Sequence, residues 1–147
     1  MAYWPLLICL IATFYFVGLI WTIQMLSYPL FQMVGRESFT VYHAAHSQRI
    51  VFILGLPLLL VFFSSLFMLW IRPINVPLWA VLLNGVLGGG VWVMTALIHV
   101  PLHSKLGRVY STHTMQALVS TNWLRTIVWT AQGLLLLWMM SVALHIM

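Results

Sequence analysis

The chain has 147 residues, of which 63% are hydrophobic and only 5% charged, and its mean hydropathy is +1.06. With Glu37 as the only carboxylate side chain and Cys9 as the only thiol, paired-carboxylate catalysis, carboxylate-bridged metal centres, disulfides and cysteine metal cages are excluded within this chain. The net charge of +5 is spread over connections, so we expect a lipid bilayer and no nucleic acid as the principal environment of a single transmembrane domain.

Four apolar segments predict an all-α, integral membrane four-helix bundle with short connections, because a bilayer core needs about 20 apolar residues per helix. Pro29 and Pro101 are expected to kink or end their helices, and Ser38 is a candidate N-terminal cap. Residues 102–120 form the longest polar stretch and are expected to be one interfacial segment. The expected helices cover residues 5–34, 41–71, 77–100 and 121–145.

The basic residues predict the orientation of this bundle. Arg36 and Arg49 flank the first connection, Lys105 and Arg108 lie in the third with Arg125 just inside, and only Arg72 lies on the opposite side. By the positive-inside rule, the first and third connections should face the cytoplasm and both termini should be extracytoplasmic. We expect a bacterial inner membrane and no secretory signal, because residues 1–5 carry no basic region.

The stretch Tyr42-His43-Ala44-Ala45-His46-Ser47-Gln48-Arg49 opens the second segment. If it is helical, Tyr42, His46 and Arg49 share one face, because positions three and four apart stack on a helix. His43 borders the same face. Imidazoles, a phenol and a guanidinium would therefore meet where a membrane helix begins.

Other polar residues are predicted to converge on this end of the bundle. Arg and His near the hydrocarbon normally point into a bundle and find partners, so the convergence favours a functional site. His113 is expected to be solvated and His145 to be a terminal interfacial residue, and the opposite end offers little beyond Asn75 and His145. The converging residues are Gln24, Tyr28, His43, His46, Arg49, His99, His103, Asn122 and Arg125.

Four histidines could ligate a metal or a haem. His99 and His103 are four residues apart, as in many helix-borne metal sites, and His43 and His46 are three apart. The second and third segments should be antiparallel neighbours, because a short turn joins them. Measured along the helices from that turn, the distances to His46 and His99 are about 39 and 33 Å at 1.5 Å per residue, so the two residues lie at a similar height in the bundle.

Acid–base chemistry on an organic ligand is the other use of these residues. His46 is the candidate base, with Arg49 or Arg125 and Tyr28 or Tyr42 stabilising an oxyanion. Arg125 should face the bundle interior, because an unpaired charge in an apolar helix costs at least about 2.5 kcal/mol. The candidate ligand contacts are Gln24, Tyr42, Asn122 and Trp129.

Several short motifs carry a resemblance to known membrane proteins. They are Trp21-Thr22-Ile23-Gln24, Tyr28-Pro29-Leu30-Phe31, Tyr42-His43-Ala44-Ala45-His46, Val100-Pro101-Leu102-His103 and Asn122-Trp123-Leu124-Arg125-Thr126. Together they resemble small four-helix bacterial membrane proteins and, more distantly, the anthrone-oxygenase-like membrane family. That resemblance implies oxygenation of an aromatic compound, although His103 stands where the family often has Asn.

Two functions from different classes follow. The first is a small membrane protein whose His-rich cytoplasmic site binds a metal, a haem or a hydrophobic aromatic or quinone-like molecule, with redox or oxygenase-like chemistry. The second is a non-catalytic accessory subunit that packs against a larger membrane complex or forms a homo-oligomer, which fits the small extramembrane mass. Co-purification in a fixed ratio with partners would favour the second.

Overall fold

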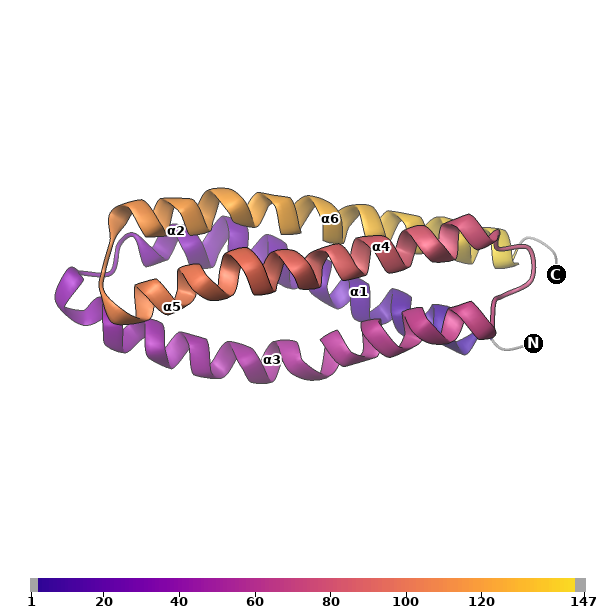
Figure 1. Cartoon of the computed structure of the whole chain (residues 1–147), viewed down its shortest axis with the longest axis horizontal. Helices are drawn as coiled ribbons and strands as arrows, with labels where there is room; N and C mark the ends of the chain where they lie inside the picture. The colour runs from indigo at the N-terminus through magenta and orange to yellow at the C-terminus, as the bar shows by residue number, and fades with distance from the viewer. Residues whose placement is uncertain (1–2, 145–147) are drawn as a thin grey trace.

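The computed structural model describes residues 3–144 and confirms the predicted all-α four-helix bundle (Figure 1). The bundle consists of four long rods, which are α1–η1–α2, α3, α4–η2–α5 and α6. Each rod is long and apolar enough to cross a membrane. The first and third rods are each interrupted by one π-helical turn. The elements in order are α1 (Trp4–Thr22), η1 (Ile23–Ser27), α2 (Tyr28–Phe31), α3 (Arg36–Trp70), α4 (Leu78–Met94), η2 (Thr95–His99), α5 (Val100–Arg108) and α6 (Thr112–Leu144).

The rods alternate in direction and form a closed ring. α1 packs against α3 and α6, and α4 packs against the same two helices, so the second and third rods are neighbours as predicted. α1 begins and α6 ends at the same end of the bundle, whereas the connections at residues 32–35 and 109–111 lie at the other end (Figure 1). Residues 71–77 form the remaining connection, in which Asn75 adopts a positive φ of 68°.

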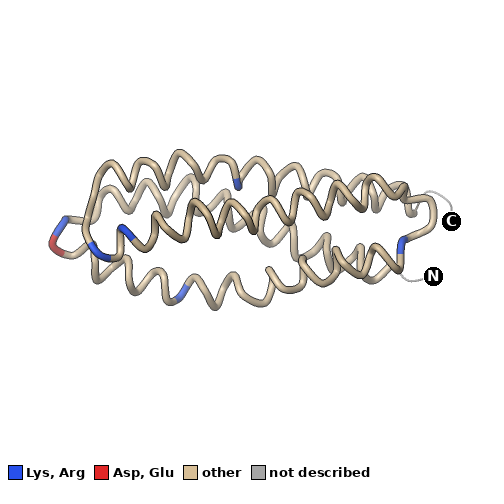
Figure 2. The backbone as a smooth tube through the Cα atoms, in the orientation of Figure 1, with Lys and Arg blue, Asp and Glu red and all other residues tan. Residues whose placement is uncertain are grey.

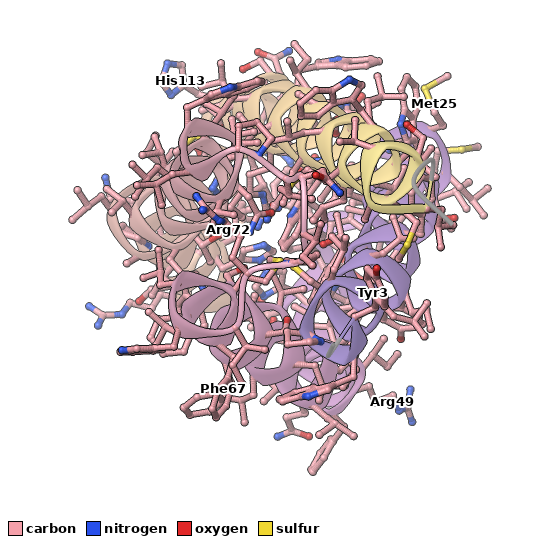
Figure 3. All side chains as sticks on the ribbon, turned by 90° about the vertical axis from the view of Figure 1, so that its right-hand side faces the viewer. Tyr3, Met25, Arg49, Phe67, Arg72 and His113 are labelled. Carbon is pink, nitrogen blue, oxygen red and sulfur yellow. The ribbon has the colours of Figure 1, made fainter. Side chains whose placement is uncertain are left out.

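The helix boundaries differ from the expected ones. α3 begins at Arg36 with Gly35 as its N-terminal cap, so Ser38 lies inside the helix and the predicted serine cap is wrong. The expected helix bounds at 100 and 121 are also wrong, because α5 runs to Arg108 and α6 starts at Thr112, so most of the expected interfacial segment 102–120 extends the third and fourth rods. His113 is exposed as expected (Figure 3), and His145 lies outside the described residues.

The prolines do not end the first and third rods, so the helix end, one of the two alternatives expected at each proline, is wrong. In η1 the backbone N–H of Tyr28 donates to Ile23 O, and in η2 that of Val100 donates to Thr95 O. Each wide turn ends just before a proline, Pro29 or Pro101, which then occupies the start of a new α-helical stretch. A missing N–H is tolerated there, so each rod continues.

Pro57 lies inside α3 and leaves the carbonyl of Ile53 without its usual donor, because proline has no N–H. The hydroxyl of Tyr15 on α1 donates to this Ile53 oxygen over 3.3 Å. A side chain of the neighbouring helix therefore satisfies the carbonyl that the proline frees and holds α3 at this point.

We expect Tyr15→Phe to lower the free energy of unfolding by about 0.5–1.5 kcal/mol, the usual net value of one hydrogen bond. In a Pro57→Ala background the restored N–H of residue 57 would satisfy Ile53, so the same substitution should cost almost nothing. A double-mutant cycle in detergent unfolding measures the difference. Equal costs in the two backgrounds would contradict this role of Tyr15.

A second polar layer crosses the half of the bundle nearer the termini, where the sequence suggested little. Asn84 Nδ2 on α4 donates to Ser65 Oγ at 2.9 Å, and Gln132 Nε2 on α6 donates to Asn84 Oδ1 at 3.0 Å. Cys9 Sγ on α1 lies 3.4 Å from Ser65 Oγ. Because each rod contributes one member, the layer fixes the mutual register of all four helices.

Candidate functional site

Arg125 is the centre of a buried polar network between the first and fourth rods. Its Nε donates to Asn122 Oδ1 at 3.0 Å, and its Nη2 donates to the same oxygen and, at 3.2 Å, to the hydroxyl of Tyr28. Asn122 Nδ2 in turn donates to Gln24 Oε1 at 2.7 Å, and Gln24 Nε2 donates to the backbone oxygen of Val119. This confirms that Arg125 faces the interior and pairs with Tyr28.

The network continues from Tyr28 into two histidines. The Tyr28 hydroxyl lies 3.3 Å from His103 Nε2, and His103 Nδ1 lies 3.0 Å from His43 Nε2. Arginine can only donate, so the Tyr28 oxygen accepts from Arg125 and its own proton points to His103. This favours the His103 tautomer that accepts at Nε2 and donates from Nδ1 to His43. Hydrogen bonds thus run in one direction from Arg125 through α2 and α5 to α3.

The first π-helical turn positions two residues of this network, and the second positions the neighbouring buried residue His99. Gln24 lies in η1 and Tyr28 directly follows it, while His99 is the last residue of η2. His99 Nδ1 lies 3.1 Å from the backbone oxygen of Met94, five residues earlier, which is the spacing of a π-turn. Single π-turns inside α-helices occur frequently at functional sites. The π-turn of the first rod therefore coincides with the polar network, and that of the third rod coincides with His99, four residues before His103 of the network.

A cavity of about 260 Å³ adjoins the network between the rods. One end is polar, formed by Tyr28, His46, Ser47, His99, His103 and Arg125. Apart from Thr95, the remaining wall is apolar and includes Trp129, whose ring stacks on Phe16 with centroids 4.5 Å apart at 9°. Apolar pockets with a few convergent polar groups are the usual form of small-molecule sites.

Two polar groups near the cavity lack partners. His99 and Ser47 both line it, and among residues 3–144 neither His99 Nε2 nor Ser47 Oγ makes a hydrogen bond although both atoms are buried. Buried polar atoms without partners are uncommon and call for an explanation such as a ligand or water. His46 also lines the cavity, with its ring edge-on to Phe31 at 4.8 Å between centroids.

The structure brings most of the predicted site residues together. His43 and His103 are hydrogen-bonded to each other, His46 and His99 share the cavity wall, and Trp129 is 3% exposed beside them. The predicted common level of His46 and His99 is therefore realised. The residues that join the network or the cavity are Gln24, Tyr28, His43, His46, His99, His103, Asn122, Arg125 and Trp129.

Arg49 and Tyr42 do not join the site, which corrects the expected inward face of α3. The Arg49 side chain extends away from the bundle (Figure 3), and Tyr42 is 42% exposed with its ring edge-on to Phe31. The inward face instead passes through His43, Ser47 and Ile50, because these positions repeat at helical spacing. Ser47 was missed, although its position four residues after His43 is a signal that it shares that face.

The predicted metal or haem ligation by histidines concerns the same part of the bundle. Within the described residues 3–144, no three or more His, Cys, Asp or Glu side chains are grouped so that they could hold a metal ion. His43 Nε2 and His103 Nδ1 are hydrogen-bonded to each other, so both nitrogens already have a partner. Ligation of a metal or haem by His43, His46, His99 and His103 stays a prediction.

Neither protein-family models, nor curated proteins, nor solved structures yield a match to this chain.

Proposed function

We propose that this protein is a membrane-embedded site for a hydrophobic aromatic or quinone-like molecule, with redox or oxygenase-like chemistry begun by proton transfer. The observation that supports this most directly is the arrangement of Arg125, Tyr28 and His103 at one end of an apolar cavity. Arg125 is the positive charge that would hold a ligand oxygen, since a charged donor favours an oxyanion over a neutral hydroxyl.

The network also supports a route for one proton. A phenolic ligand that donates its hydroxyl proton to the Tyr28 oxygen lets the Tyr28 proton move to His103 Nε2. The proton on His103 Nδ1 then moves to His43 Nε2, which leaves the ligand with one negative charge and His43 with one positive charge. The ligand oxyanion remains beside Arg125, and dioxygen or another electron acceptor would be the co-reactant for oxidation of the electron-rich ring.

The test uses protein in lipid nanodiscs and 1-naphthol as a probe whose phenol and phenolate absorb at different wavelengths. Wild-type protein should bind the probe saturably and raise its phenolate absorbance relative to empty nanodiscs. An optical spectrum and metal analysis of the same preparation test the metal or haem prediction separately. No saturable binding above empty nanodiscs would overturn the proposal.

A second candidate, the accessory subunit, is supported by another surface. A groove of about 300 Å³ lies between α3 and α4 near the termini, and Gly85, Gly88 and Gly89 are part of its lining. Small residues let a further helix approach closely. A subunit would co-purify in a fixed ratio with a partner. Gly85→Leu should abolish this co-purification without changing 1-naphthol binding.

The orientation prediction follows from the charge distribution in three dimensions. Most basic residues lie in the half that carries the 32–35 and 109–111 connections, one on α6 lies near the middle of the bundle, and Arg72 belongs to the 71–77 connection at the opposite end (Figure 2). We expect a reporter fused at the C-terminus to report the extracytoplasmic side and one inserted at residues 109–111 to report the cytoplasm. The opposite pair of results would move the polar end of the cavity to the outer face.

A further inference from the structure

We infer that the ligand is a lipid-phase amphiphile with one slim apolar chain, and that it enters sideways from the bilayer between α3 and the η2–α5 rod. This inference rests on the proposed function, because it takes the polar end of the cavity as the place of the ligand's head. It adds the chemical class of the ligand and its route of entry.

The length of the cavity argues for a chain. Its lining covers the same twelve-residue interval in three rods, from Phe16 to Tyr28, from His46 to Leu58 and from Val91 to His103. At 1.5 Å per residue each interval is about 18 Å long. Near the 32–35 connection the three intervals end in Tyr28, His46 and His103. Toward the middle of the bundle they end in apolar residues. A ligand that fills this space has a polar head and an apolar tail along the bundle axis.

The exposure of the lining residues locates the opening. Val51 on α3 is 63% exposed and Val100 at the start of α5 is 57% exposed, whereas the other lining residues within 3–144 are buried or half-buried. α3 packs against α4 and against α5 but not closely against η2 between them. Val51 and Val100 therefore form the two rims of an opening in the side of the bundle.

The surroundings of this opening are apolar. Phe52 beside one rim is 85% exposed, and Leu97 near the other is 72% exposed. Both belong to rods that are long and apolar enough to cross a membrane. A side opening at such a surface faces lipid tails, so a molecule already dissolved in the bilayer reaches it directly while a polar aqueous metabolite does not.

The entry route is tested with 4-octyl-1-naphthol and protein in nanodiscs, by stopped-flow quenching of tryptophan fluorescence. Val100→Trp enlarges a rim residue, and Val93→Trp is its matched control, because Val93 is also 57% exposed but lines neither cavity. We expect Val100→Trp to slow association at least about tenfold, by overpacking the rim, and Val93→Trp to leave it unchanged. Equal rates for the two variants would overturn entry at this rim.

The apolar chain of the ligand is tested at the other end of the cavity. Leu58→Trp fills the apolar end, and the adjacent Leu59, which is 48% exposed and does not line the cavity, is the control position. Leu58→Trp should weaken binding of 4-octyl-1-naphthol about tenfold and leave 1-naphthol unaffected, whereas Leu59→Trp should change neither. Equal losses of binding for both probes in Leu58→Trp would overturn the inference that the ligand carries an apolar chain.

These results separate the inference from the proposed function. If Arg125→Gln abolishes 1-naphthol binding while Val100→Trp and Leu58→Trp behave as their controls, the inference fails and the proposed function stands. If Val100→Trp and Leu58→Trp have the expected effects while Arg125→Gln binds normally and no phenolate forms, the proposed function fails. The amphiphile site and its side entry would then remain.

Discussion

Arg125→Gln should weaken 1-naphthol binding at least about tenfold, because the substitution removes the positive charge at the polar end of the cavity. It should also lower the free energy of unfolding by about 1–3 kcal/mol, since Tyr28 loses a donor and Asn122 Oδ1 loses both of its donors. Probe titration in nanodiscs measures the first effect and detergent unfolding the second.

Two variants sharpen this result. Arg125→Lys keeps the charge but cannot donate to Asn122 and Tyr28 together as the guanidinium does, so its binding should lie between wild type and Arg125→Gln. Arg49→Gln removes an equal charge from an exposed arginine that faces away from the bundle, and it should change neither binding nor stability by a measurable amount (Figure 3). Equal binding losses in Arg125→Gln and Arg49→Gln would show that general electrostatics, and not this site, holds the probe.

His103→Gln should abolish phenolate formation from bound 1-naphthol while leaving saturable binding within about threefold of wild type, because Arg125 still holds the oxygen. A glutamine side chain can accept a hydrogen bond from Tyr28, but it cannot accept a proton at one nitrogen and release one from another as imidazole does. The ratio of phenolate to phenol absorbance at saturating probe measures the effect.

His113→Gln is the matched control for this variant, since His113 is an exposed histidine on α6 outside the network. It should form phenolate as wild type does. His43→Gln should resemble His103→Gln, because it removes the group that takes the proton from His103 Nδ1. Normal phenolate formation in His103→Gln would contradict the proton route through Tyr28, whichever way binding changes.

Composition and hydrophobic pattern were sufficient to predict the fold. Four apolar runs long enough for a bilayer satisfy their backbone groups as helices, and the short turn between the second and third runs predicted that these two helices are antiparallel neighbours. The common level of His46 and His99 also followed from the sequence. Helical rise converts residue number into height, and that conversion needs no knowledge of side-chain contacts.

Rotation of each helix about its axis could not be obtained in the same way. The residues Tyr42, His43, His46 and Arg49 occupy less than two and a half turns, so a small rotation of α3 decides which of them face inward. In the structure His43 is hydrogen-bonded to His103 and His46 lines the cavity, whereas Tyr42 and Arg49 are exposed. A polar cluster in a sequence does not show which of its residues face inward, because the rotation of the helix depends on how the neighbouring rods pack against it.

The sequence alone therefore determined that the chain forms four apolar helices, that the second and third are neighbours and that the polar residues share one level. Only the tertiary structure decided that Pro29 and Pro101 follow π-turns within continuous rods. A proline lacks an N–H, and whether this ends a helix depends on the hydrogen bonds of the turn before it. Only the tertiary structure joined Cys9, Ser65, Asn84 and Gln132 into a second polar layer. These four side chains are far apart in the sequence, and only packing of the helices brings their hydrogen-bonding groups together.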